Sequence, residues 1–260
     1  MDYNTIKITT TAAEKILLDT YNIKGNAFSL PGYVDFNFRI KVENKEGFIL
    51  KISRPDENKK YLDYQQNLLQ FIEASDEELI APKVILDING NSISEIKDAF
   101  GKQRYVRMLT WVSGRVWSLV NPQLEDFRFS LGTQCGLLTK ALQGFDHPEA
   151  HYYFEWDVAQ SLWTKEHLHL FSSQKREVIK HFQDLFENSH SSYQNLRKSI
   201  VHNDPNDNNI IVSDSVLNPK AIAAIDYGDA IYTQIINDVA ILCAYGAFGH
   251  NAPLNALLDL

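Results

Sequence analysis

The sequence has few of the features that mark secreted, membrane-embedded or nucleic-acid-binding proteins. Only two of its 260 residues are cysteine, Cys135 and Cys243, and each lies in an apolar helical pattern. We therefore expect two buried free thiols in a reducing compartment rather than a disulfide framework. No apolar run is long enough to span a bilayer, and the first five residues lack the basic and apolar regions of a signal peptide. These absences predict a cytoplasmic protein.

Positive charge is also scarce. The chain has a formal net charge of −8 and no basic tract, so nucleic acid and membrane surfaces are poor candidate partners. This charge is compatible with a cationic small substrate. Internal repeats and low-complexity stretches are missing as well, and 44% of the residues are hydrophobic. That composition suits a globular chain large enough for two lobes with separate cores.

Hydrophobic periodicity predicts a β-rich first half and a helical second half. The first half is predicted to contain helices over 11–21 and 61–72, a hairpin over 36–42 and 48–52 around a turn at 44–47, and strands over 82–86 and 105–109. The second half is predicted to contain helices over 124–142, 156–170, 174–188 and 235–247. Asn121 is expected to cap the first of these, with Pro122 in its first turn. We expect domains at 1–110 and 111–260.

One polar motif late in the chain predicts phosphoryl-transfer chemistry. It consists of His202, Asp204 and Asn209, spaced as His-x-Asp-x-x-x-x-Asn, and two short apolar runs later come Asp226 and Gly228, spaced as Asp-x-Gly. Each part alone is ordinary loop chemistry, because Asp and Asn often hydrogen-bond nearby backbone in turns. The combination is typical of a site that holds a proton acceptor and a metal ion beside one phosphate chain.

The two apolar runs predict how the motif comes together. Residues 210–212 and 221–225 have the composition of short buried strands, with turn residues between them. If the strands pair antiparallel, the start of the first lies beside the end of the second, so Asn209 and Asp226 meet. Their amide and carboxylate oxygens suit a Mg²⁺ ion that keeps waters and shares phosphate oxygens. Asp204 precedes the first strand and can reach the same place.

These features together resemble the aminoglycoside phosphotransferase and choline kinase superfamily, the small-molecule branch of the protein-kinase-like fold. Segments 30–38, 106–114, 145–148 and 156–157 are similar to a narrower hydroxylysine-kinase-like group that includes kinase-like domains fused to aminotransferase-type enzymes. The resemblance covers about residues 10–250. It implies an α+β, two-lobed fold, in which a β-rich N-lobe has one main helix and a helical C-lobe carries the catalytic hairpin.

The resemblance also implies roles for the residues of the motif. Asp204 would accept the proton of the substrate hydroxyl, and His202 would brace the catalytic loop. Asn209 and Asp226 would hold Mg²⁺ on the phosphates of ATP or GTP.

The cofactor-binding residues that the resemblance implies in the first half are Lys51, Asp35, Asn37, Leu109 and Trp111. Lys51 would contact the α- and β-phosphates, and the backbone of residues 109–111 would meet the adenine. Taken alone, Lys51 is more often a solvated strand lysine, and only its context favours the phosphate role. Its expected helix partner is either Gln65 or Asp63. The phosphate-covering loop lacks Gly-x-Gly-x-x-Gly, which argues against an ordinary protein kinase.

Two acidic residues are candidates for the substrate site. Asp207 either lines that site or forms the loop turn, and Asp229 either binds a substrate amine or caps the next helix. His147 and Asp157 are expected to be packing or capping residues rather than ligands. Only 31 residues follow Asp229. We therefore expect either a compact family member or the N-terminal portion of a longer chain, with a fused or missing C-terminal region.

The sequence thus predicts a small-molecule kinase, an ATP- or GTP-dependent phosphotransferase with an alcohol group as acceptor and Mg²⁺ as metal. Hydroxylysine, amino alcohols and homoserine are the candidate acceptors by resemblance. A catalytically inactive nucleotide-binding module, or a domain of a larger enzyme, is the alternative. The motifs disfavour an antibiotic aminoglycoside kinase and a protein kinase.

Overall fold

The chain has an α+β fold, as predicted, with an antiparallel sheet in its N-terminal part and a helical C-terminal part. The computed structural model describes residues 7–32, 35–43, 45–75 and 78–260. Two compact units are present, one comprising residues up to Ser75 together with Ile80–Gly114 and the other mainly Arg115–Leu260. Expectations placed on residues 1–5, 33–34, 44 and 76–77 lie outside the described residues.

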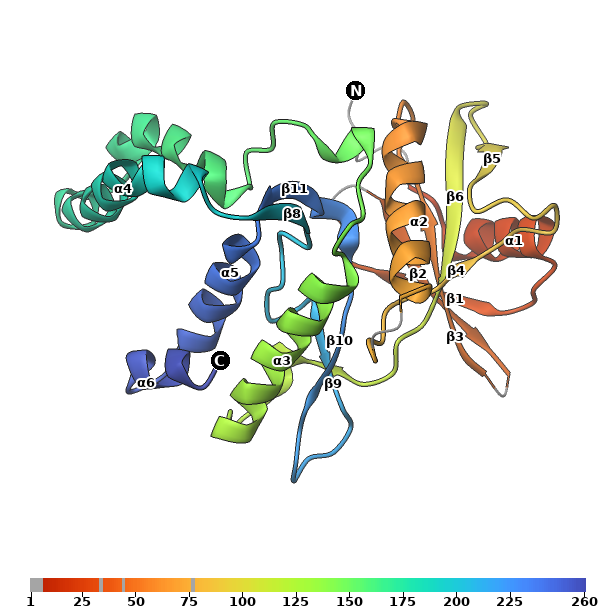
Figure 1. Cartoon of the computed structure of the whole chain (residues 1–260). Coiled ribbons are helices and arrows are strands. Elements are labelled where there is room, and N and C mark those ends of the chain that lie inside the picture. The colour runs from red at the N-terminus through yellow and green to blue at the C-terminus, as the bar shows by residue number, and fades with distance from the viewer. Residues whose placement is uncertain (1–6, 33–34, 44, 76–77) are drawn as a thin grey trace. The chain divides into compact units, whose positions relative to one another are not determined.

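The first unit is built on an antiparallel sheet (Figure 1). Its strands are β1 (Asn26–Leu30), β2 (Phe36–Val42), β3 (Lys45–Ile52), β4 (Val84–Ile85), β5 (Ser94–Lys97) and β6 (Gln103–Thr110), and its helices are α1 (Thr10–Tyr21) and α2 (Lys59–Glu73). The strand order is β1-β2-β3-β6-β4, and β5 also pairs with β6. The predicted hairpin and both helices are confirmed. The edge strand β1 and the short β5 were not predicted, because β1 is mostly exposed and without regular polar–apolar alternation, and β5 is short and largely polar.

Side-chain alternation gives this sheet one apolar and one polar face. The apolar face packs against α1, and its buried residues are Phe38, Ile40, Leu50, Ile52, Val106 and Met108. Because successive side chains of a strand point to opposite faces, Lys51 and Arg107 project to the other side. There Gln65 of α2 accepts a hydrogen bond from Arg107. The two helices therefore cover opposite faces of the sheet (Figure 1), and Lys51, Arg107 and Asp35 lie close together on the face of α2.

The second unit is mainly helical and contains two small sheets. Its helices are α3 (Glu125–Ala141), α4 (Ser173–Gln194), α5 (Ile236–Ala247) and α6 (Pro253–Leu258), with 3-10 segments η2 (Trp117–Leu119), η3 (Pro148–Ala150), η4 (Val158–Leu170) and η5 (Tyr227–Asp229). Its strands are β7 (Arg115–Val116), β8 (Lys198–Val201), β9 (Ile210–Val212), β10 (Ala221–Ala224) and β11 (Ile231–Gln234). The sheet orders are β10-β9-β7 and β11-β8, and α3 packs on β10.

Two helix predictions for this unit are corrected by the structure. Helix α3 begins at Glu125, with Leu124 as its N-cap, so Asn121 and Pro122 precede the helix rather than start it. The acidic residues Glu125 and Asp126 occupy the first turn, where they complement the helix dipole. Segment 156–170 is mostly the 3-10 helix η4 rather than an α-helix.

Helix α5 is only partly buried, although residues 235–247 are apolar enough to predict a buried helix. Its buried residues include the polar Asn237 and Asp238, whereas Ile236 is 45% exposed. The polar residues face inward because they have hydrogen-bond partners there.

Both cysteines are free, as predicted, although they are only partly buried. Burial raises the pKa of the Cys135 thiol to about 12, which keeps that thiol protonated and unreactive. Among the described residues, no helix combines the length and the apolar character needed to cross a bilayer.

Candidate active site

The predicted antiparallel hairpin of β9 and β10 is confirmed. Ala224 pairs with Ile210, and the amide of Ile225 donates to the carbonyl oxygen of Asn209 at 2.8 Å. This bond extends the ladder by one residue beyond the two strands. Asn209, which precedes β9, and Asp226, which follows β10, therefore lie at the same end of the hairpin.

Asp204 is held in place by the amides of two asparagines. Asn206 Nδ2 donates to Asp204 Oδ1 at 2.7 Å, and Asn209 Nδ2 donates to Asp204 Oδ2 at 2.8 Å. Burial raises the pKa of Asp204, and the negative charge of Asp226 raises it further, against the lowering effects of Asn206, His202 and Asn209. The effect of Asp226 places the two carboxylates within electrostatic reach of each other. Asn206 had no predicted role, although it stands inside the motif.

His202 connects the catalytic loop to the hairpin. Its Nδ1 accepts the backbone N–H of Asp204 at 3.2 Å, and its Nε2 lies 3.0 Å from the carbonyl oxygen of Ile225. Because Nδ1 is an acceptor, we assign the ring proton to Nε2, which then donates to that carbonyl. The side chain is fully buried. These contacts fit a bracing role and leave no ring nitrogen for proton transfer to a substrate.

Asp238 of α5 supports the same loop, and no motif pointed to it. Its carboxylate accepts the backbone N–H of His202 at 2.9 Å and that of Asn203 at 2.8 Å. Asn203 has a φ of 66°, a left-handed conformation that persists only where the surroundings stabilise it. Burial raises the pKa of Asp238. The only sequence signal was an acid inside an apolar helix, which is costly to bury without hydrogen bonds.

Asn209 and Asp226 have the chemistry to hold a metal ion. The Nδ2 group of Asn209 donates to Asp204, so its amide oxygen is the atom available as a ligand. Asp226 is exposed, with a left-handed backbone at φ 61°. In the part of the chain that the structure describes, no cluster of three or more His, Cys, Asp or Glu side chains could hold a metal. The donor pair therefore suits Mg²⁺, which takes its other ligands from phosphates and water.

The two predicted substrate residues have different surroundings. Asp207 accepts from Asn208 Nδ2 at 3.2 Å. Asp229 ends η5 and is followed by β11, so it does not cap the next α-helix, and that alternative is wrong. Burial raises the pKa of Tyr245, and the charges of Asp204 and Asp207 raise it further. Both carboxylates are therefore within electrostatic reach of this phenol.

The capping residues outside the motif are as predicted. Asp157 accepts the N–H of Ala159 at 3.0 Å and begins η4, while His147 Nδ1 accepts the N–H of Glu149 at 3.1 Å and begins η3.

The predicted phosphate-binding lysine lies on the polar face of the first unit's sheet. Lys51 pairs across the sheet with Asn37 of β2 and with Arg107 of β6. Its Nζ lies 3.8 Å from Asp35 Oδ2, and its side chain is only 14% exposed, so it is not a solvated strand lysine. The amide oxygen of Gln65, one expected partner of the lysine, accepts from Arg107 at 2.5 Å.

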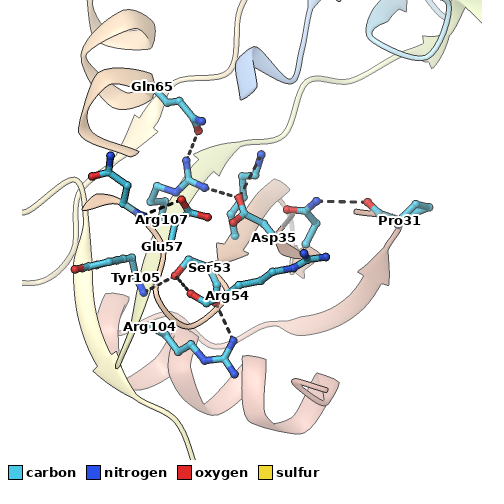
Figure 2. A network of polar contacts seen from close by, with 12 residues as sticks. Pro31, Asp35, Ser53, Arg54, Glu57, Gln65, Arg104, Tyr105 and Arg107 are labelled. Atoms are coloured by element: carbon cyan, nitrogen blue, oxygen red, sulfur yellow. Dashed lines mark hydrogen bonds and ion pairs between the residues drawn. The ribbon is translucent and has the colours of Figure 1, made fainter. Parts of the chain in front are cut away.

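The other predicted nucleotide residues of this unit are tied to its sheet. Asn37 Nδ2 donates to the carbonyl oxygen of Pro31 at 3.4 Å (Figure 2). Leu109 pairs with Ile49 of β3. The N–H of Trp111 donates to the carbonyl oxygen of Gly47 at 3.2 Å. Because the backbone N–H of Trp111 already donates to Gly47, a backbone hydrogen bond between Trp111 and adenine would use the carbonyl oxygen of Trp111.

The chain belongs to the phosphotransferase enzyme family, whose profile matches residues 29–259. Its fold is similar to that of a microcompartment-associated aminopropanol kinase, with a TM-score of 0.72 and 17% identity over 96% of this chain and 78% of that one. It is also similar to an amicoumacin kinase in complex with AMP-PNP, Ca²⁺ and Ami, with a TM-score of 0.68 and 17% identity over 100% and 77% of the two chains. At this identity the likeness shows the fold alone.

Hydroxylysine kinases are among its sequence relatives, which confirms the resemblance seen in the motifs. The enzyme of Mus musculus is 27% identical over 237 residues, which are 83% of this chain and 63% of that protein. The enzyme of Bos taurus is 24% identical over 253 residues, which are 86% and 65% of the two. The chain therefore spans less than two thirds of the length of these two relatives.

Proposed function

We propose that this chain is a small-molecule kinase that transfers the γ-phosphoryl group of ATP or GTP to a hydroxyl of an amine-bearing metabolite. The observation that supports this most is the fixing of both Asp204 carboxylate oxygens by Asn206 and Asn209, at the end of the hairpin that bears Asp226. Membership of the phosphotransferase family supports the class of reaction.

In the proposed reaction, Asp204 accepts the proton of the acceptor hydroxyl. The hydroxyl oxygen bonds to the γ-phosphorus, the bond from that phosphorus to its bridging oxygen breaks, and the nucleoside diphosphate leaves with the electron pair. Mg²⁺, held by Asn209 and Asp226, would neutralise charge on the phosphates, and Lys51 would do the same from the sheet. The protein mainly positions groups and stabilises charge, because this transition state needs little covalent chemistry.

The preference for an amine-bearing acceptor is supported by the local field. Asp204 and Asp207 are both within electrostatic reach of Tyr245, and two nearby carboxylates favour an ammonium group over a neutral one. The names hydroxylysine kinase and aminopropanol kinase both describe acceptors with an amine and a hydroxyl. Hydroxylysine, short amino alcohols and homoserine are therefore the acceptors to try first.

The test is a panel of amino alcohols and hydroxy amino acids, supplied with Mg²⁺ and either ATP or GTP. Product is measured by mass spectrometry and by release of nucleoside diphosphate. Asp204→Ala should lower transfer by about 10²–10⁴-fold, the usual contribution of a positioned base, and leave nucleotide binding nearly intact. Asp214→Ala is the matched control, because this exposed aspartate lies in the turn of the same hairpin.

The results of this panel test the role of Asp204 and separate the proposed function from the inactive alternative. Transfer by Asp204→Ala at the wild-type rate would remove Asp204 as the base. Failure of every acceptor would contradict the proposed function, and if Mg-nucleotide still bound, it would support the inactive nucleotide-binding module.

A further inference from the structure

A buried arginine lies next to Lys51 in the first unit. Arg107 stands opposite Lys51 in the pairing of β3 with β6, and it is 1% exposed. One arm of its guanidinium donates to Gln65 Oε1 at 2.5 Å, and the other donates to Asp35 Oδ2. Figure 2 shows the guanidinium between these two partners. The same Asp35 oxygen lies 3.8 Å from Lys51 Nζ.

These contacts connect α2 to Lys51 through Gln65, Arg107 and Asp35. A buried guanidinium is costly unless its donors are satisfied and its charge is balanced. Gln65 satisfies one arm without adding charge, and Asp35 provides both an acceptor and the counter-charge. The planar fork of arginine lets one side chain hold both partners in fixed directions, which the single ammonium group of lysine does not.

The arrangement also gives the carboxylate of Asp35 two basic partners. Arg107 and Lys51 share one carboxylate oxygen of Asp35. The contact of Asp35 with Arg107 is the closer one, and the contact with Lys51 is longer. Asp35 therefore orients Lys51 while most of its own charge is balanced by Arg107.

We propose that Arg107 is a positioning residue for nucleotide binding, which connects helix α2 to Lys51 through Gln65 and Asp35 and so helps to hold the lysine in place. The proposal rests on the proposed function, because it assigns Lys51 to the phosphates. In this arrangement helix α2 affects the position of Lys51 indirectly, through Arg107 on the neighbouring strand.

The experiment measures binding of Mg-ATP and Mg-GTP by calorimetry, together with thermal unfolding of each unliganded variant. Arg107→Lys keeps the charge but cannot bridge Gln65 and Asp35. We expect it to weaken nucleotide binding about tenfold, the equivalent of one lost charge-assisted hydrogen bond. Gln65→Leu removes the α2 side chain that accepts from Arg107 and changes no charge. It should also weaken nucleotide binding.

Arg104→Lys is the matched control. Arg104 lies on the same strand, is also fully buried, and pairs with Asp98 and the carbonyl oxygen of Ser53, away from Lys51. The Arg104→Lys variant should lose thermal stability as Arg107→Lys does, but it should keep wild-type nucleotide affinity. Asp35→Asn should weaken binding too, and the double variant of Asp35→Asn with Arg107→Lys should lose less than the sum of the single losses, because both act through one contact.

The outcomes separate this inference from the proposed function. Wild-type protein that binds neither nucleotide would contradict the proposed function itself. If the wild-type protein binds nucleotide, three results would each overturn the positioning role alone. The first is wild-type affinity in Arg107→Lys, and the second is an equal loss of affinity in Arg104→Lys and Arg107→Lys. The third is additive losses of affinity in the double variant.

Discussion

Neutral amides organise the chemistry around Asp204. Asn206 and Asn209 each donate one hydrogen bond to its carboxylate, and a buried histidine aligns the backbone of the same loop. An amide directs a carboxylate without bringing a full charge beside it. Burial and the nearby Asp226 can therefore keep the pKa of Asp204 raised, which favours proton acceptance from a hydroxyl.

Asp207 provides a residue-level prediction about the acceptor. Asp207→Asn keeps the shape but removes a negative charge, so the KM for an amine-bearing acceptor should rise about tenfold, as for the loss of one interaction with a charged group. The KM for nucleotide should not change. Spectrophotometric titration should also show the pKa of Tyr245 moving down, toward its ordinary value. Asp214→Asn is the control, and an equal rise in KM for an acceptor without an amine would contradict the assignment.

Asp238 leads to a prediction about stability. Asp238→Asn leaves only one oxygen for the two amides that the aspartate accepts, those of His202 and Asn203. Leaving one buried donor without an acceptor should lower the free energy of unfolding by about 1–3 kcal/mol, measured by urea denaturation at neutral pH. A variant as stable as wild type would show that the two bonds contribute nothing.

The pH dependence of the same residue follows from its raised pKa. In the native state, Asp238 takes up a proton at a higher pH than in the unfolded chain, whose pKa stays near 3.8. As the pH falls from neutrality toward that value, the native state binds more protons, so the stability contributed by Asp238 rises. The stability difference between wild type and Asp238→Asn should therefore grow on acidification. A difference that shrinks would give the opposite sign and contradict the raised pKa.

At the scale of the element, the β9–β10 hairpin places two candidate metal ligands at one end. Its strands are short, but the side chains of β9 are almost fully buried: Ile210, Ile211 and Val212 are at most 5% exposed. The hairpin turn is solvated, and Leu217 within it is 95% exposed. Packing of the strands, and not the turn, therefore sets the position of Asn209 and Asp226.

This contrast can be measured with two alanine substitutions. Ile211→Ala should lower the free energy of unfolding by about 2–5 kcal/mol, as core truncations do, and should weaken Mg²⁺-dependent nucleotide binding. Leu217→Ala should change stability by less than about 0.5 kcal/mol and leave binding unchanged. Equal effects in chemical denaturation would mean that the hairpin is not anchored by its strands.

On the scale of the whole molecule, each unit contains a polar network of its own. One joins α2, β3 and β6 around Arg107, and the other joins the catalytic loop to α5 through Asp238. The candidate metal ligands are in the second unit, and the candidate phosphate-binding lysine is in the first. The proposed function predicts that both sets of residues affect the binding of Mg-nucleotide.

Ligand-induced stabilisation tests this for the intact chain. Mg-ATP or Mg-GTP at about 100 times its Kd should stabilise the native state by about 2.7 kcal/mol through mass action, seen as a rise in Tm. A chelator should remove the magnesium-dependent part of the shift, and Asn209→Ala and Asp226→Ala should lack it from the start. Asp214→Ala should behave as wild type. A Tm shift that is the same with and without Mg²⁺ in every variant would contradict the metal pair.

The sequence by itself determined the fold class, the β9–β10 hairpin and the family, because these depend on local information. Alternation and spacing indicated that residues 210–212 and 221–225 pair antiparallel, and this pairing alone places Asn209 beside Asp226. The motif spacing likewise marked Asp204 and His202 without any knowledge of packing. The sheet strands with strong alternation were found for the same reason.

Only the tertiary structure decided the partners of buried charges. Asp238 supports a loop 35 residues earlier in the chain, and Arg107 contacts Gln65 and Asp35, which are 42 and 72 residues away. A charge inside an apolar helix or strand shows that a partner must exist, because burial without one is costly, but local pattern does not say where. Packing brings these residues together, so only the structure showed that Gln65 accepts from Arg107.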